Sequence, residues 1–163
     1  MTKKIIALLL CLMLALMLTA CGGDTDDAGS TGNNVTVDVQ KVYNDCIDRM
    51  NEMVPLDADM MLDFCGIKAE DCVKAFVAIS SDGLLTDEIW LIEAVNADAA
   101  QRLLNQADNR LEAKAEESQS YSPVQYAVVQ KAQVIRTGNY IAVLVAPNVD
   151  ELKTVVDTAF GNK

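Results

Sequence analysis

An internal repetition in the second half of the chain restricts the possible fold more than any other feature. Residues 89–107 align without a gap on residues 141–159, at an offset of 52 positions, and five of the nineteen positions are identical. Each segment passes from an apolar run to an asparagine and then an acid, as a strand leading into a capped helix requires. The identical pairs are Ile89 and Ile141, Ala94 and Ala146, Asn96 and Asn148, Asp98 and Asp150, and Ala107 and Ala159. The alignment predicts a repeated strand-strand-helix unit, with convergence as the alternative.

The first unit is predicted to contain two strands and a long helix. Apolar residues indicate strands at residues 73–80 and 87–95, and Asp82-Gly83 between them suits a turn. Apolar positions then recur at intervals of three and four across residues 100–111, which indicates a helix. We expect this helix to fade near Ser118.

The second unit repeats this order. Strands are predicted at residues 133–137 and 140–146, and Gly138-Asn139 between them is typical of a two-residue type II′ hairpin. Asn148 is expected to begin the last helix.

A short helix is predicted between the two units. Ser122 can cap it, and Pro123 suits its first position because proline lacks the N–H that would be unpaired there. Gln125 is placed to complete a capping box with Ser122.

The region before the units is predicted to be helical. Apolar residues at helical intervals across 39–53 indicate an amphipathic helix that Pro55 stops. Asp57 can cap a shorter helix through Phe64, and Gly66 is well placed at its C-terminal cap. The methionines of this region are expected to fill the core, or alternatively to form an adaptable binding surface. They are Met50, Met53, Met60 and Met61.

These elements predict an α+β fold. We expect N-terminal helices followed by two strand-strand-helix units, which form a four-stranded, mainly antiparallel sheet with helices packed on one face. The strand runs are nearly continuous in apolar residues, which indicates central strands or burial on both faces. The strand order stays open, and so does a short parallel contact between the units.

The start of the chain is typical of an export signal. Lys3 and Lys4 precede fourteen uncharged residues at 5–18, fewer than the roughly 20 that a spanning helix needs. Small residues follow, as in a segment that is cleaved after translocation. A short uncleaved anchor is the alternative.

Leu18-Thr19-Ala20-Cys21 resembles the lipobox of bacterial lipoproteins. The resemblance implies cleavage before Cys21 and a diacylglyceryl group on its thiol, so that acyl chains hold the protein in a lipid bilayer. The expected organisation is a signal peptide at 1–20, a flexible acidic tether at 21–36 and one globular domain at 37–163. The expected location is the outer face of the cytoplasmic membrane.

Charge restricts the partners of the exported chain. After removal of residues 1–20, 11 basic residues stand against 24 acidic ones, a net charge of −13. Such a chain repels phosphates, so nucleic acid is not expected as a partner. Acidity that merely keeps the domain soluble explains the same charge.

Residue types also restrict the chemistry. The chain has no histidine, which removes the usual general base near neutral pH. Cys46, Cys65 and Cys72 lack the paired spacing of zinc motifs, so no metal and no cofactor is expected. Three free thiols are favoured, and a bridge between Cys65 and Cys72 stays open. The acidic residues are expected on exposed faces.

The ordered motifs resemble a known family. The segments FCGIKAEDC, DEIWLIEA and YSPVQYAVVQKAQVIRTGNYIAVLVA are similar to the domain of unknown function 4358, found in lipoproteins of Gram-positive anaerobes. The resemblance covers about residues 40–160 and brings no catalytic or ligand-binding residues with it.

Together these features favour a non-catalytic binding or interaction module of the cell envelope, with an envelope protein as a possible partner. Tyr121, Tyr126 and Tyr140 are candidates for a recognition surface, because tyrosine is enriched in binding patches. Ordinary packing of the three rings is the alternative. The second functional hypothesis is a carboxylate-dependent enzyme that acts on envelope glycans or peptides, which requires two acids in one pocket.

Overall fold

The two repeated units build the centre of a five-stranded sheet. The computed structural model describes residues 36–162, so the signal peptide, the lipobox and most of the predicted tether lie outside the described residues. The strands follow the order β1-β2-β3-β5-β4, and each neighbouring pair is antiparallel. They are β1 (Met53–Pro55), β2 (Cys72–Ser80), β3 (Glu88–Ala94), β4 (Gln133–Thr137) and β5 (Tyr140–Val145).

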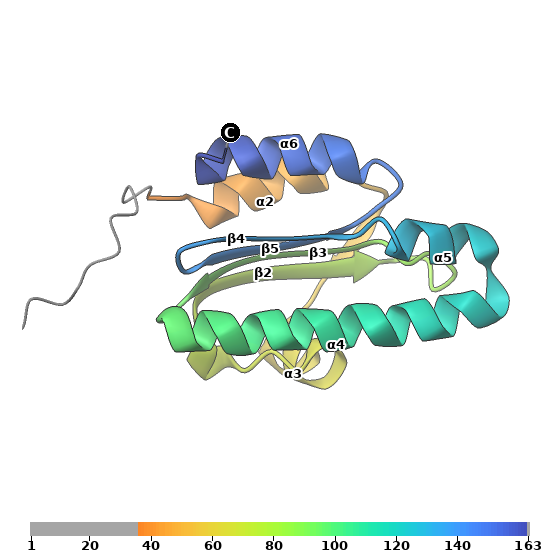
Figure 1. Ribbon diagram of the computed structural model, residues 1–163, viewed down its shortest axis with the longest axis horizontal. Coiled ribbons are helices and arrows are strands. Elements are labelled where there is room, and N and C mark those ends of the chain that lie inside the picture. Colours follow the sequence, from red (N-terminus) through yellow and green to blue (C-terminus); the bar gives the residue numbers. More distant parts are fainter. Residues whose placement is uncertain (1–35, 163) are drawn as a thin grey trace, which may run out of the picture. The chain divides into compact units, whose positions relative to one another are not determined.

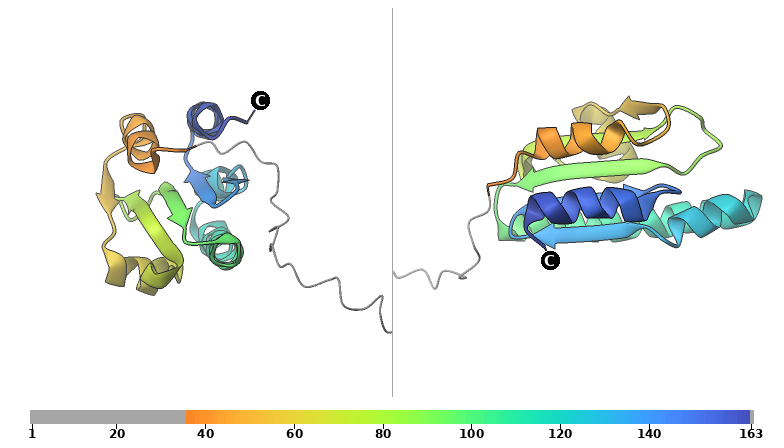
Figure 2. Two further views of the ribbon diagram at one scale, coloured as in Figure 1. Left: turned by 90° about the vertical axis from the view of Figure 1, so that its left-hand side faces the viewer. Right: turned by 90° about the horizontal axis from the view of Figure 1, so that it is seen from above.

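Helices cover both faces of this sheet (Figures 1 and 2). Helices α2 and α6 lie side by side on one face, and α3 and α4 lie on the other. The described helices are α2 (Val39–Ile47), α3 (Ala58–Cys65), the short 3-10 helix η1 (Ala69–Asp71), α4 (Ala97–Tyr121), α5 (Pro123–Val129) and α6 (Val149–Phe160). The α+β class is confirmed, but the prediction of four strands with helices on one face is wrong.

The pairing of β3 with β5 explains why the helices lie on opposite faces. Ile89 pairs with Leu144, and its repeat equivalent Ile141 pairs with Ile92, the equivalent of Leu144. Residues directly opposite each other on neighbouring strands share a face, whereas Ile89 and Ile92 lie three positions apart on β3 and point to opposite faces. The equivalent residues therefore lie in different layers: Ile89 packs in the layer of α2 and α6, whereas Ile141 packs in the layer of α4. Equivalent helices therefore cover opposite faces.

Both layers are apolar, which accounts for the continuous apolar runs of β3 and β5. Along β3 the side chains alternate between the layers, with Leu91 toward α2 and α6 and Ile92 toward α4. Both are fully buried. Each layer is closed by apolar helix positions, such as Leu152 of α6 and Leu103 of α4.

The N-terminal region differs from the prediction. Helix α2 ends at Ile47, and Met53 to Pro55 form the edge strand β1, whose residues pair with Ser80 to Ala78 of β2. Proline is tolerated in an edge strand because the position of its missing N–H can face away from the neighbouring strand, so that no hydrogen bond of the sheet is lost. Met50 and Met53 still pack against the core, so the apolar spacing marked buried positions correctly while the backbone there is not helical.

Helix caps follow the sequence in part. The side chain of Asp57 accepts from Met60 N–H and Gly66 closes α3 at φ 68°, as predicted. Ser122 accepts from Gln125 N–H at 3.3 Å, but the Gln125 side chain bonds Thr86 and leaves the capping box half formed. Asn148 makes no side-chain cap; its amide donates to Arg49 O.

Glycine substitutions test the turn conformations. Gly138 has φ 59° with open space around it, so Gly138→Ala is expected to cost about 1–2 kcal/mol through backbone strain alone. Gly66→Ala should cost at least as much, because an added Cβ at φ 68° would also lie 2.5 Å from Gln106 Oε1. Urea unfolding measures both. Gly83→Ala is the control, because nothing lies within 4 Å of its Cβ position; an equal loss of stability there would contradict the account.

Candidate functional site

A fully buried carboxylate lies between the sheet and α4. Glu88, the first residue of β3, is 1% exposed. Arg110 Nη2 lies 2.9 Å from its Oε2, and Lys114 Nζ lies 2.9 Å from the same atom. Trp90 Nε1 donates to Oε1 at 2.7 Å, and Cys65 Sγ lies 3.8 Å from it. We call Glu88, Arg110 and Lys114 the charge cluster.

The charge cluster fixes the ionisation of Glu88. Burial alone would raise the pKa of Glu88, but the charge of Lys114 and the hydrogen bonds from Arg110 outweigh burial and hold the pKa below its ordinary value. The carboxylate raises the pKa of Arg110 in turn, against the effect of burial. Glu88 is therefore a permanent carboxylate near neutral pH, which suits a structural ion pair and not a proton donor.

The prediction that acidic residues lie on exposed faces is wrong for Glu88, so the charge cluster was not expected from the sequence. Alternation along β3 places Glu88 on the same face as the buried Trp90. On α4, Arg110 and Lys114 continue the stripe of Leu103 at helical spacing. The strand alternation and the helical spacing can both be read from the sequence. Each places a charged residue on the side of its element that is otherwise apolar and buried.

A small cavity of about 160 Å³ adjoins the charge cluster. Three acidic residues are among those that line it, together with Arg110 and Lys114. The acids are Asp82, Asp87 and Glu117. Asp87 is 1% exposed and its Oδ2 accepts from Asn51, whereas its buried Oδ1 has no hydrogen-bond partner among residues 36–162.

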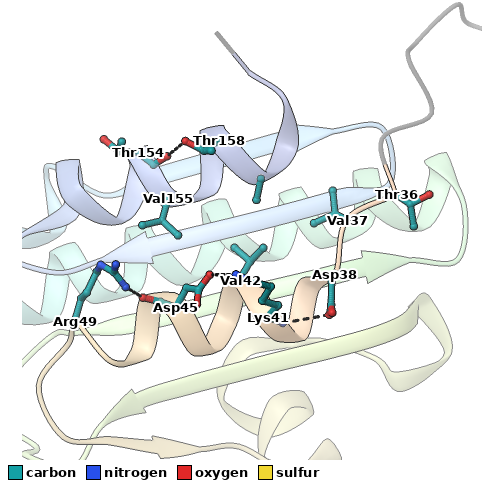
Figure 3. Close-up of a pocket in the computed structure, with 11 residues that line it drawn as sticks. Thr36, Val37, Asp38, Lys41, Val42, Asp45, Arg49, Thr154, Val155 and Thr158 are labelled. Atoms are coloured by element: carbon teal, nitrogen blue, oxygen red, sulfur yellow. Dashed lines mark hydrogen bonds and ion pairs between the residues drawn. The ribbon is translucent and has the colours of Figure 1, made fainter.

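A larger groove of about 510 Å³ lies between α2 and α6 (Figure 3). Val37, Val42 and Val155 give it an apolar part, and charged side chains of α2 border it. These charges have partners within the fold: Lys41 pairs with Asp45 at 2.6 Å. Arg49 likewise pairs with Glu151 of α6 at 3.2 Å. The groove therefore offers a partly apolar surface, and these ion pairs leave no cluster of like charges beside it.

The three candidate tyrosines lie in different surroundings. Tyr121, the last residue of α4, is 47% exposed and lines the small cavity. Tyr126 is half-buried on α5. Tyr140 begins β5 opposite Glu93, at the other end of the sheet from Glu88, and its ring packs 6.1 Å from that of Phe160. The structure does not bring Tyr140 together with Tyr121, and a recognition role for each stays a prediction.

The described thiols are free and weakly acidic. Cys46, Cys65 and Cys72 form no disulfide. Burial raises the pKa of Cys46 and Cys72 to about 11 and that of Cys65, which also faces Glu88, to about 12. All three are therefore protonated at neutral pH. Among residues 36–162, no three acidic or thiol side chains gather closely enough to hold a metal ion. Cys21, the predicted lipid attachment site, lies outside the described residues.

Replacement of Glu88 by glutamine tests the charge cluster. Glu88→Gln leaves two cations without a counter-charge and is expected to cost about 3–5 kcal/mol at neutral pH. Because the folded-state pKa of Glu88 is depressed, its contribution is complete above the ordinary value of 4.5 and is lost as the pH falls through the folded-state pKa. The difference between wild type and variant should therefore shrink in acid.

Denaturant unfolding across this pH range measures both effects. Glu93→Gln, on the same strand with a half-exposed side chain, is the matched control and should change stability by less than about 0.5 kcal/mol. A Glu88→Gln protein with the stability of wild type at neutral pH would contradict the assignment.

Comparison with known proteins identifies the family of this chain but assigns no activity to it. The model of a domain of unknown function, DUF4358, matches residues 45–146, which include the whole charge cluster and all five strands. No curated protein and no solved structure matches the chain. The match covers more than half of the chain and confirms the predicted family. The chain belongs to the DUF4358 family.

Proposed function

We propose that this protein is an extracytoplasmic lipoprotein, anchored by acyl chains on Cys21, that serves as a non-catalytic binding or interaction module of the cell envelope. The lysines at positions 3 and 4, the uncharged run and the lipobox support the location. No helix within residues 36–162 is long and apolar enough to cross a membrane.

The surroundings of Glu88 and of the described thiols support a non-catalytic role. Glu88 receives hydrogen bonds from Arg110, Trp90 and Lys114, and its pKa is held low. A general acid needs the opposite shift, toward neutral pH. The described thiols are protonated at neutral pH, since burial raises their pKa to about 11 or 12. Glu88 and the described thiols are therefore engaged in ion pairing and packing, whereas Oδ1 of the buried Asp87 has no hydrogen-bond partner among residues 36–162.

One observation favours the alternative of a carboxylate-dependent enzyme. The acids Asp82, Asp87 and Glu117 line the same cavity. However, Oδ1 of Asp82 accepts from Leu84 N–H and Oδ2 of Asp87 accepts from Asn51. The cavity of about 160 Å³ is also smaller than the roughly 300–1,000 Å³ of most small-molecule sites, so a binding module is the better account.

Replacement of Cys21 tests the anchor. Cys21→Ser removes the thiol that would carry the lipid, so the protein is expected to leave the washed membrane fraction and appear in the medium or the soluble fraction. Cell fractionation with immunoblotting measures the distribution, and mass spectrometry of the wild-type N-terminus measures acylation.

Cys11→Ser is the matched control, because Cys11 lies in the apolar run that precedes the lipobox. It should leave the membrane fraction unchanged. Retention in the washed membranes of a Cys21→Ser chain from which residues 1–20 have been removed would overturn the proposed location. A wild-type chain that is unacylated, or that still carries residues 1–20, would overturn it as well.

A further inference from the structure

Exposed apolar side chains gather at one end of the fold. Leu84 in the β2–β3 loop is 72% exposed, Val124 on α5 is 71% exposed and Tyr121 at the end of α4 is 47% exposed. Thr86 N–H and Oγ1–H both donate to Gln125 Oε1, at 3.0 and 2.9 Å, so the loop is fastened to the first turn of α5. The three exposed side chains therefore belong to one fixed region.

An apolar groove of about 440 Å³ continues this region. It lies between α5 and the β5–α6 connection, with Val124 and Ala127 on one side and Pro147 on the other. Val128 and Ala146, which are 9% and 1% exposed, also line it. We call this groove, together with Leu84, Tyr121 and Val124, the distal surface.

The distal surface lies far from the point where the described chain begins. Thr36 lines the α2–α6 groove beside Thr158, near the C-terminal end of α6. Helix α5 and the β2–β3 loop lie at the other end of the sheet (Figure 1). The distal surface and Thr36, the first described residue, are therefore at opposite ends of the domain.

The charges around the distal surface select the partner. Asp82 and Glu117 are exposed and line the cavity beside Tyr121. The cations of that cavity, Arg110 and Lys114, are paired with Glu88, and Lys131 lines the groove. The whole chain carries a net charge of −11. A second copy would bring the same acidic border against itself, and an anionic membrane would be repelled. An apolar segment with adjacent Lys or Arg side chains is complementary both to the apolar groove and to the exposed acids.

We infer that the distal surface binds a segment of another envelope protein in which apolar side chains are accompanied by Lys or Arg. The apolar side chains enter the groove beside α5 and cover Val124, and the basic side chains face Asp82 and Glu117. An amphipathic segment placed in a groove in this way is a recurring mode of peptide recognition. This inference rests on the proposed function and names the surface and the partner chemistry of the interaction module.

Site-specific cross-linking in living cells tests the inference. A photo-cross-linking amino acid replaces Val124 in the full-length chain, and in separate strains it replaces Thr158 in the α2–α6 groove or Val73. Val73 is 56% exposed and lies at the start of β2, the other end of the sheet. Mass spectrometry of the adduct identifies the linked segment and not merely the linked protein.

The expected result is an adduct at position 124, absent at positions 158 and 73, whose linked segment contains apolar residues and Lys or Arg. Leu84→Lys should reduce the adduct about tenfold, because it removes an apolar contact and repels a basic partner. Val73→Lys, the same kind of change at an exposed apolar residue at the other end, should leave the adduct unchanged.

Other outcomes overturn the inference, and they separate it from the proposed function. An adduct at position 158 and not at 124 would rule out the distal surface as the binding site. The protein would then be an interaction module that uses the α2–α6 groove. An adduct at position 124 with lipid, with a second copy of the chain or with an acidic segment would remove the proposed partner. No adduct at position 124 or 158 would count against the distal surface and the interaction module together.

Discussion

The contact of Glu88 with Arg110 and Lys114 is the interaction on which the arrangement of this domain depends. One carboxylate at the start of β3 bonds two cations that lie one turn apart on α4, and Lys114 also donates to Thr86 O at 3.0 Å. Because Glu88 is fully buried, either charge alone would be costly inside the fold. The contact therefore holds α4 against the start of β3. The Thr86–Gln125 hydrogen bonds join the same end of β3 to α5.

The pairing of β3 with β5 and the charge cluster act on different parts of the molecule. Alternation along β3 and β5 distributes their apolar side chains to both faces of the sheet and needs no polar group. The charge cluster has no counterpart in the second unit, since the repeat equivalent of Glu88 is Tyr140. The two units therefore differ beside the small cavity, which Arg110 and Lys114 line.

Several elements could be predicted well from the sequence, both in the two units and in α3 before them, because their signals are local. The apolar runs, the Gly138-Asn139 turn and the caps at Asp57 and Gly66 each depend on residues a few positions apart. The number of strands and the placement of helices on two faces depend on contacts between distant segments. Edge strand β1 has only three residues, too few to show a period, and its partner β2 begins 17 positions after it ends.

The candidate site was harder to predict for a related reason. Whether an acid at the start of a strand is buried depends on the helix that crosses it, and Arg110 and Lys114 lie more than 20 positions from Glu88. The phase of Glu88 with Trp90 was a usable signal, but a surface acid at a strand end shows the same pattern. For the tyrosines, residue type alone does not show which rings lie together: Tyr121 lies at the small cavity, whereas Tyr140 packs on Phe160.

The ionisation of Glu88 is the most direct measure of the central contact. In the full-length protein labelled with ¹³C at glutamate side chains, the carboxyl resonance of Glu88, assigned by its loss in Glu88→Gln, can be followed through an acid titration. The account predicts a midpoint below the ordinary value of 4.5, because Lys114 and Arg110 favour the charged form more strongly than burial opposes it. A midpoint at or above 4.5 in the folded protein would contradict it.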